Sequence, residues 1–461
     1  MVQYNKMRIC LPENLKSLAD LCPKPLYAVG GYVRNFLIDG TVSDDLDIAA
    51  SLSTEEIEKA AKLCGFKVVA EYKRTGTAVI SDGKRKYEYT RFRTDFYGLG
   101  GGHKPAATMF TEDVALDARR RDFKCNAVYY DIKNDKIVDP LNGVCDIRDK
   151  ILDTVIEPEK VFKSDGLRLL RLARFAAELN FTPTEKVLSG AKTYADNIRD
   201  IAPERIYEEI KKILVSDGKY KFSDKKGHYT GFVIMEKTGV LDVLFPELTA
   251  GRGMSQRVDF HRYDVLEHSL RTLMYADKSV RLAALFHDVG KPYRQLNCGT
   301  YKGHAEEGER IAREIMQRLK TDKRTAEKIA FLIRWHMFDI NCGESERAVR
   351  RFIAENSGAI DALLKLKQAD YSAGKDDFSV CPTVKRWTEI LGAMKSDGTP
   401  FSVKDLKITA ADLKKIGFKD KSIGEELKRL FLFAVDNPRF NEFTALEAQA
   451  KKDFKGCDFV A

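Results

Sequence analysis

The sequence of 461 residues contains no run of 18 or more apolar residues, and it does not begin like a secretory signal. A transmembrane helix needs about 20 consecutive apolar residues. We therefore predict a cytoplasmic protein with no membrane partner. The nine cysteines are scattered and none forms a C-x-x-C pair. This excludes a disulfide framework and a cysteine zinc site of the usual spacing, and it predicts reduced thiols.

The composition also lacks the features of a disordered chain. Hydrophobic residues make up 44% of the sequence, which is enough for buried cores, and the length suggests several domains. The formal net charge is +9. A positive charge favours a polyanionic partner, because binding releases counterions from phosphates. Charge alone does not identify that partner.

Pattern changes along the chain predict an α+β head followed by a helical body. Residues 1–140 mix short strand-like runs with helices, whereas most of the chain after Glu157 has an apolar period of 3.6 residues. Turn-rich sequence near residues 139–143 marks a junction. We predict four domains, with boundaries at 1–140, 141–250, 251–375 and 376–461.

Two acidic residues near the start of the chain have the spacing of a metal site. Asp45 and Asp47 are separated by one residue, and on a strand such residues point to the same face. Paired carboxylates on one face can hold two Mg²⁺ ions. A bare D-x-D is more often an exposed pair with no ligand, so the prediction depends on the surrounding sequence.

The residues before this pair suit a triphosphate. Gly30 and Gly31 have no Cβ, so their backbone can approach phosphate oxygens closely. Arg34 lies one turn into the helix that is expected to follow, and its guanidinium adds a forked donor for phosphate. The sequence from Val29 to Asp47 therefore predicts a metal-dependent enzyme that uses nucleoside triphosphates.

Two further blocks make a family resemblance specific. The run from Lys86 to Arg93 alternates like a strand and contains Glu88, and the block R-R-D-F-K-C-N-A contains Arg121, Asp122 and Asn126. With these blocks the sequence resembles the class II tRNA nucleotidyltransferases, or CCA-adding enzymes, and the related bacterial poly(A) polymerases. The resemblance implies a polymerase-beta-like head, with Glu88 as the third acidic residue and the R-R-D block at the nucleotide.

A third block lies on a helix that begins near residue 164 and repeats arginine every three residues. The resemblance implies that Asp165 and Arg168 read the base edge of CTP or ATP, and that Arg171 and Arg174 bind phosphates or hold the helix in place. A solvated basic face is the alternative. Ser164 stands where the family usually has Glu, which leaves the bracing of Arg168 and the switch from C to A addition open.

The stretch from Thr94 to Asp113 is rich in glycine and includes a proline, so we predict a flexible loop there. In the family this loop is needed to add the final A, and relatives that add only C lack it. Its presence favours synthesis of the complete C-C-A. A surface excursion without function would have the same composition.

Histidines form the second informative constellation. In chain order they are His268, His287 with Asp288, His304 and His336, followed by Asp370, and the text H-D-V-G-K surrounds the central pair. This resembles an HD phosphohydrolase domain. Imidazoles with carboxylates suit Mn²⁺, Ni²⁺ or Zn²⁺, and six ligands suffice for one or two ions. A purely structural site is the alternative. His261 is not counted as a ligand.

Taken together, these blocks predict a CTP(ATP):tRNA nucleotidyltransferase that adds or repairs the 3′-terminal CCA. Its substrates are tRNA, CTP and ATP, and Mg²⁺ is held by Asp45 and Asp47. Residues 141–250 would select the nucleotide and bind RNA, and residues 376–461 would contact tRNA. Three alternatives stay open: a poly(A) polymerase, a protein whose main activity is an HD-domain phosphodiesterase or phosphatase, and a tRNA-binding protein without catalysis.

Overall fold

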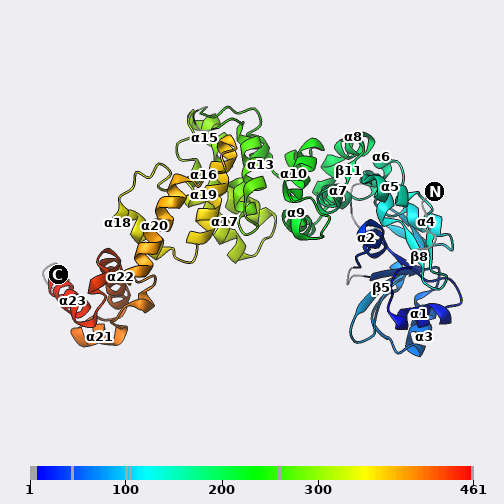
Figure 1. The fold of residues 1–461 in the computed structure, drawn as a ribbon, viewed down its shortest axis with the longest axis horizontal. Coiled ribbons are helices and arrows are strands. Elements are labelled where there is room, and N and C mark those ends of the chain that lie inside the picture. Colours follow the sequence, from blue (N-terminus) through cyan, green and yellow to red (C-terminus); the bar gives the residue numbers. More distant parts are fainter. Residues whose placement is uncertain are drawn as a thin grey trace. The chain divides into compact units, whose positions relative to one another are not determined.

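The computed structural model describes residues 8–42, 46–98, 102, 105–257, 259 and 261–457, with side chains described as far as residue 454. The chain divides into two compact units (Figure 1). The first comprises Met1–Thr249 with Arg318–Lys320, and the second comprises Ala250–Gln317 with Thr321–Ala461. Among the described residues, no helix is both long and apolar enough to cross a bilayer.

The head of the first unit is built on a seven-stranded sheet with the strand order β3-β4-β5-β2-β1-β8-β9. Strand β2 pairs with β1 in the antiparallel sense and with β5 in the parallel sense. Tyr87 and Tyr89 of β5 are at most 1% exposed, so the residue between them faces away from the core. The strands are β1 (Tyr27–Val29), β2 (Leu46–Ala50), β3 (Lys67–Tyr72), β4 (Thr77–Ser81), β5 (Lys86–Arg91), β8 (Tyr129–Asp131) and β9 (Lys136–Val138).

Three helices of the head are α1 (Glu13–Leu21), α2 (Gly31–Asp39) and α3 (Thr54–Leu63). Helix α3 begins at a capping box, in which the Ser53 side chain accepts from the Glu56 N–H and the Glu56 side chain accepts from the Ser53 N–H. These bonds satisfy two backbone donors that a helix start otherwise leaves free. Helix α2 follows β1 directly, which places its first turn beside β2.

The prediction of a loop from Thr94 to Asp113 is wrong at both ends. Strands β6 (Arg93–Phe96) and β7 (Ala107–Phe110) pair as an antiparallel hairpin, with Thr94 opposite Met109. The glycines that suggested a loop lie between the strands in the sequence, and two of the four, Gly100 and Gly101, are outside the described residues. The residues of these short strands, R-T-D-F and A-T-M-F, do not alternate between polar and apolar, so the local pattern gave no strand signal beside the glycine-rich sequence.

The rest of the first unit is almost entirely helical, as predicted. Helix α7 (Leu167–Leu179) packs on α9 (Pro203–Leu214) and α10 (Gly227–Lys237). Gly231 permits the close approach of α10, because a Cβ there would lie 2.5 Å from the Ile213 side chain. Proline at the first turn of α9 suits a helix start. The other elements are α4 (Val114–Arg119), η3 (Lys124–Asn126), α5 (Gly143–Asp149), β10 (Ile151–Leu152), α6 (Pro158–Ser164), β11 (Thr182–Pro183), α8 (Glu185–Thr193), α11 (Val240–Leu244) and α12 (Pro246–Thr249).

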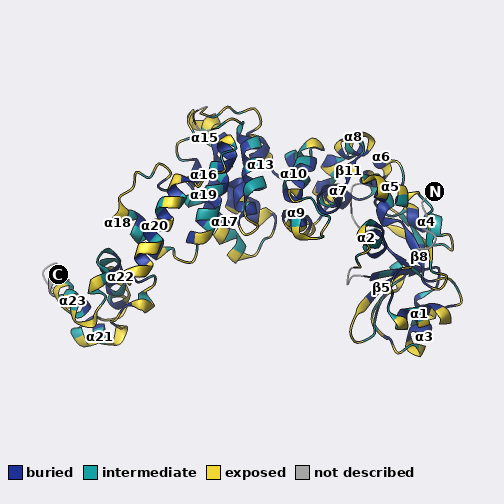
Figure 2. Cartoon of the chain, viewed as in Figure 1, coloured by how far each residue is buried: buried dark blue, intermediate teal, exposed yellow. Residues whose placement is uncertain are grey.

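The second unit is helical throughout its described part. Helices α13 and α19 pack on each other, and α14 and α17 lie against them, so that the buried faces form one core (Figure 2). The helices are α13 (Val265–Tyr275), α14 (Arg281–Phe286), α15 (Gly290–Cys298), α16 (His304–Arg318), α17 (Lys323–Trp335), α18 (Glu346–Glu355), α19 (Ile360–Lys375), α20 (Pro382–Ser396), α21 (Ala410–Ile416), α22 (Lys421–Asp436) and α23 (Phe443–Cys457).

A carboxyl pair between α22 and α23 yields a prediction about stability. The Glu426 side chain is 2% exposed, and its only ion pair among the described residues is with Arg429, at 3.3 Å. Burial raises the pKa of Glu426 to about 7, and the neighbouring Asp453 adds to the shift. Because the folded pKa lies above the ordinary glutamate value of 4.5, ionisation removes stability as the pH rises from below 5 through 7.

We therefore expect Glu426→Gln to stabilise the α22–α23 pair by about 2 kcal/mol at pH 8, since one pKa unit corresponds to about 1.4 kcal/mol. The difference should be small at pH 5. Hydrogen exchange of the α22 amides at the two pH values measures it. Glu425→Gln, at a side chain that is 65% exposed, is the control and should change neither value. An equal gain at both pH values would contradict the prediction.

Candidate active site and candidate metal centre

The acidic residues of the head meet where β2 lies between its two neighbours. The strand register places Asp47 opposite Val29 of β1 and opposite Glu88 of β5. Residues opposite each other in a sheet share a face, so Asp47 and Glu88 lie side by side. Asp45 lies outside the described residues, so its predicted pairing with Asp47 stays a prediction. The structure thus brings together two of the three predicted acids.

The start of α2 closes one side of this acidic face. Gly30 has a φ of 78°, and a Cβ on it would lie 3.2 Å from the Asp47 Oδ2 atom. Both facts require glycine, because an L side chain is strained at this φ and would crowd the carboxylate. The first N–H groups of a helix have no partner within the helix, and together with the helix dipole they favour anions. Gly31 begins α2 beside this position.

Arg34, for which phosphate binding stays a prediction, is held by protein groups in the structure. Its side chain is buried, with the residue 2% exposed. The guanidinium donates hydrogen bonds to the Oδ1 atoms of Asn126 and Asn35, and it lies over the Phe175 ring at 5.3 Å. In this arrangement Arg34 ties α2 to η3 and α7. Its bonds stabilise the turn that carries Gly30.

The R-R-D block continues this network into the helical body. Asp122 is 5% exposed, accepts from the Asn126 Nδ2 atom at 3.1 Å, and pairs with the Arg171 guanidinium at 2.6 Å. Burial would raise the pKa of Asp122, but Arg171 and the Asn126 amide outweigh it and hold that pKa well below its usual value. Asp122 is therefore charged at neutral pH and fixes Arg171 on the exposed side of α7.

Sequence reasoning missed Asp117, which organises the other arginines of the block. Its side chain is fully buried and accepts hydrogen bonds from the Arg120 Nε atom at 2.7 Å and from the Tyr129 hydroxyl at 2.6 Å. Arg121 pairs with the same carboxylate at 3.3 Å and donates to the Tyr129 hydroxyl at 3.0 Å. The available signal was the spacing of three and four residues from Asp117 to Arg120 and Arg121, which suits contacts at the end of a helix even though α4 ends at Arg119.

The predicted base-reading residues lie together at the start of α7. Asp165 is 4% exposed, lies two residues before the first residue of α7 and accepts from the Leu167 N–H at 2.9 Å. Arg168 donates to the Ser164 hydroxyl at 3.2 Å and to the main-chain oxygen of Arg120 at 2.6 Å. The serine that replaces the family's usual Glu therefore still contacts Arg168, but as a neutral acceptor.

Arg174 holds α7 in place. Its Nε atom lies 3.0 Å from a Glu209 carboxylate oxygen on α9, and the guanidinium covers the Phe175 ring at 4.4 Å. Of the two roles predicted for Arg174, contact with phosphate and support of the helix, these contacts favour the second. The residues predicted to pack behind the arginines, Leu167, Leu170 and Ala173, are all buried.

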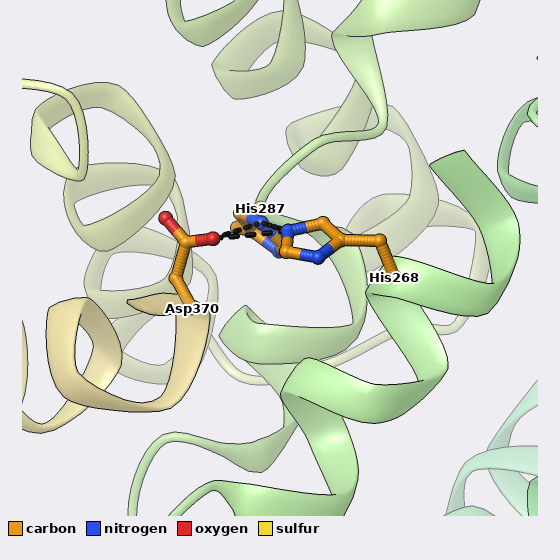
Figure 3. A group of neighbouring side chains, drawn as sticks. All are labelled: His268, His287 and Asp370. Carbon is orange, nitrogen blue, oxygen red and sulfur yellow. Dashed lines mark hydrogen bonds and ion pairs between the residues drawn. The ribbon is translucent and has the colours of Figure 1, made fainter. Parts of the chain in front are cut away.

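The six residues of the histidine constellation converge in the second unit. They come from five separate segments, and they form two groups in which one ligand atom of each residue lies within 4.8 Å of the others. His268, His287 and Asp370 form the first group (Figure 3). Asp288, His304 and His336 form the second. The sequence prediction of this set is consistent with the structure in every member.

Backbone carbonyl groups orient three of the four imidazoles. The Nδ1 atoms of His287, His304 and His336 lie 2.8, 2.9 and 2.7 Å from the main-chain oxygens of Ala284, Tyr301 and Ile333. Each Nδ1 must carry the proton in order to donate, so each Nε2 lone pair faces the centre of the cluster. This is the arrangement that metal-bound histidines normally have.

Asp288 connects the two groups through its two carboxylate oxygens. Oδ2 lies 3.2 Å from the His287 Nε2 atom, and Oδ1 lies 3.2 Å from the His304 Nε2 atom. Burial would lower the pKa of His287, yet Asp288 and Asp370 raise it to about 10, so a proton on the His287 Nε2 atom competes with a metal ion for that lone pair. The cluster therefore favours a bound positive charge. Four imidazoles and two carboxylates fit a divalent transition metal.

His261 lies at the edge of this cluster and belongs to neither ligand group. Its ring packs edge-on against the His268 ring, with the centroids 4.5 Å apart. Burial, with help from neighbouring positive charges, lowers its pKa to about 4. His261 is therefore neutral at neutral pH, and the decision not to count it as a ligand is consistent with the structure.

Family models match three parts of the chain. Residues 26–153 match the "Poly A polymerase head domain", residues 180–251 match the "Probable RNA and SrmB-binding site of polymerase A", and residues 265–371 match the "HD domain". The first match contains Asp47 and Glu88, and the third contains all six residues of the histidine constellation.

Relatives of known name match over longer stretches. The CC-adding tRNA nucleotidyltransferase of Thermus thermophilus is 31% identical over 366 residues, which cover 76% of each chain. The A-adding tRNA nucleotidyltransferase of Deinococcus radiodurans is 32% identical over 276 residues, 56% of this chain and 60% of that protein. The crystal structure of the Bacillus stearothermophilus CCA-adding enzyme in complex with CTP aligns with a TM-score of 0.65 at 19% identity, over 98% of this chain and 100% of that one.

The head, with its acidic sheet face beside a glycine turn, and the helical units that follow define a nucleotidyltransferase with an attached HD domain. The extent of the match to the Thermus protein decides the family. The chain belongs to the tRNA nucleotidyltransferases, the family that includes the CCA-adding enzymes.

Proposed function

We propose that this protein is a CTP(ATP):tRNA nucleotidyltransferase that adds or repairs the 3′-terminal CCA of tRNA. The observation that carries the proposal is the juxtaposition of Asp47 with Glu88 beside the first turn of α2. Acids on one sheet face next to a glycine turn and a helix N-terminus suit a nucleoside triphosphate and its cations. The relatives that add C, A or both to tRNA support the choice of substrates.

In this proposal Asp45 and Asp47 hold Mg²⁺ and Glu88 assists them. When bound, Mg²⁺ supplies a Lewis acid that acidifies the tRNA 3′-hydroxyl and neutralises charge on the triphosphate. The turn at Gly30 and Gly31 orients the triphosphate, so that the α-phosphorus faces the hydroxyl and pyrophosphate leaves on the opposite side. Arg34 acts indirectly, by holding that turn.

Selection of the base is assigned to the start of α7. Asp165 and Arg168 present an acceptor and a donor from adjacent turns, and such a pair can match the polar edge of cytosine or adenine. Arg168 is held by Ser164 and by the Arg120 carbonyl. The neutral serine leaves more of the positive charge of Arg168 for the base than a glutamate would. Arg121, Asp122, Asn126 and Arg171 form the framework around this position.

The test is extension of two tRNA transcripts, one ending at the discriminator base and one ending in C-C. Each is incubated with purified protein and Mg²⁺ and with CTP, ATP or both, and products are read at single-nucleotide resolution. We expect C-C-A on the first and a single A on the second. Addition of only C-C to the first transcript, or of A to the second transcript but nothing to the first, would identify an enzyme that makes only part of the CCA end. A long A tract would favour the poly(A) polymerase, and no extension would contradict the proposal.

The division of the HD ligands into two groups joined by Asp288 favours a second candidate function. In it, the two ligand groups would hold Mn²⁺, Ni²⁺ or Zn²⁺, and the bound ion would supply Lewis-acid activation of water for phosphoester hydrolysis. The class of reaction is phosphomonoester or cyclic phosphodiester hydrolysis. A cytoplasmic location and the four domain boundaries also stay predictions.

A further inference from the structure

Lys367 is a buried lysine that neither proposed function uses. It is 4% exposed, and the described residues give it no carboxylate partner within ion-pair distance. Its ammonium group instead donates hydrogen bonds to the main-chain oxygens of His336 and Phe338, each at 2.6 Å. A buried charge is costly unless it is well paired. The cost of burying this charge, with two main-chain oxygens as its acceptors, points to a specific task.

The carbonyl group of His336 lies at the end of α17, and that of Phe338 lies in the turn that follows. His336 is the residue that ends this helix, and the last carbonyls of a helix lack partners within it. A cation at a helix C-terminus satisfies such carbonyls and interacts favourably with the helix dipole. The Lys367 ammonium therefore fixes the backbone of His336, whose side chain is one of the ligands of the second group.

The same lysine is also tied to the first ligand group through its own helix. Lys367 and Asp370 are three residues apart on α19, so their side chains lie on the same face. The bonds from Lys367 thus join the end of α17, which carries His336, to the helix that carries Asp370. Distances between ligands from different groups depend on how these two helices are held together.

Trp387 covers this joint, by which we mean the contact that Lys367 of α19 makes with the end of α17. It is fully buried, its ring lies 5.4 Å from the Lys367 Nζ atom, and its Nε1 atom donates to the Asp339 carboxylate at 2.8 Å. The ring keeps water from the ammonium, which strengthens the two bonds to the carbonyl groups. Asp339 in turn pairs with Arg386 at 2.8 Å, so the turn after His336 is anchored to α20.

From this geometry we infer that Lys367 is a positioning residue for the metal centre: it sets the backbone of His336 relative to Asp370 and so brings the two ligand groups to metal-binding distance. The inference rests on the second proposed function, because it requires the cluster to bind a divalent metal. Residues that orient metal ligands without touching the ion typically affect metal affinity by 10- to 100-fold.

The experiment is a Zn²⁺ titration of the full-length protein, followed by tryptophan fluorescence. The chain has two tryptophans, and both adjoin the joint: Trp335 precedes His336, and Trp387 covers Lys367. Zn²⁺ is a closed-shell ion and does not quench by itself. Asp288→Asn, which removes the carboxylate shared by the two groups, separates the signal of this centre from that of Zn²⁺ bound elsewhere, such as at exposed cysteines.

We expect Lys367→Met to lower the Zn²⁺ affinity about tenfold or more, and Lys367→Arg, which keeps the charge and the donors, to recover most of it. Lys365→Met is the matched control, because Lys365 lies on the same helix with 40% of its side chain exposed and pairs with Asp361. Its affinity should equal that of the wild type.

A lower melting temperature of Lys367→Met with unchanged Zn²⁺ affinity would overturn the inference, because a purely structural role moves only the first quantity. If Lys367→Met does not fold, Lys367→Gln keeps a neutral NH₂ donor group without the charge and should show a weaker form of the same loss. Unchanged affinity there would overturn the inference as well. If the wild type and Asp288→Asn give the same fluorescence response to Zn²⁺, the cluster does not bind the metal. That result would overturn the metal centre and, with it, the role of Lys367.

Discussion

Replacement of Asp47 with Asn is expected to lower nucleotide addition by at least about 10³-fold, while tRNA binding stays close to that of the wild type. A metal ion at a phosphoryl-transfer site stabilises the transition state by several kcal/mol, and each 1.4 kcal/mol is about tenfold in rate. Asn keeps the size of Asp47 and its place on β2, between β1 and β5, but it removes the charge that the ion needs. The extension assay on the C-C-ending transcript, at saturating ATP, measures the loss.

The control for this experiment is Glu71→Gln. Glu71 lies on β3, at the edge of the same sheet, and its side chain is exposed. Its replacement should leave the rate within about twofold, as surface changes away from a site usually do. Asp45→Asn should behave like Asp47→Asn. If either Asp variant adds nucleotides at the wild-type rate, the acidic residues of the head do not catalyse the proposed reaction.

The acidic residues of the head were predictable, but their arrangement was not. Alternation marks Asp47 and Glu88 as outward-facing strand residues, because each lies between buried neighbours. Nothing in the local sequence says that β2 and β5 are parallel neighbours in a register that sets these two residues opposite each other. Strand pairing of that kind is decided by the packing of the whole sheet, which a single sequence does not encode locally.

The sequence also could not show which buried residues contact the arginines. Arg34 and Arg174 look alike as basic residues on helix faces, yet the first bonds to asparagines of α2 and η3 and the second pairs with Glu209 of α9. A basic residue on a helix is more often solvated than buried. Only the positions of α2, α7 and α9 show which of these side chains are enclosed.

The metal centre was predictable to a greater extent, because its residue types are rare and its central motif is local. His287 and Asp288 are adjacent, and the other histidines follow in the family's order. The acceptors that orient the imidazoles are main-chain oxygens, which carry no signal in the sequence. For the same reason Lys367 could not be distinguished from the exposed lysines of α19.

Replacement of Asp288 with Asn is expected to lower metal binding and phosphoester hydrolysis by about 10²-fold or more, without affecting nucleotide addition. Asp288 is the residue whose two oxygens face both ligand groups, at 3.2 Å from His287 and 3.2 Å from His304. Asn offers one neutral oxygen and one donor, so it can serve neither group as an anionic ligand, and loss of negative charge weakens binding of a divalent ion.

The measurement pairs hydrolysis of 2′,3′-cyclic AMP and p-nitrophenyl phosphate, in Mn²⁺, Ni²⁺ or Zn²⁺, with the tRNA extension assay on the same preparations. Asp361→Asn, at a side chain that is 83% exposed, is the control and should retain both activities. Because Asp288 and Asp47 lie in different compact units, each variant should lose one activity and keep the other. Hydrolysis that survives in Asp288→Asn but fails in Asp47→Asn would place both reactions in the head, and the histidine cluster would then be a structural metal site.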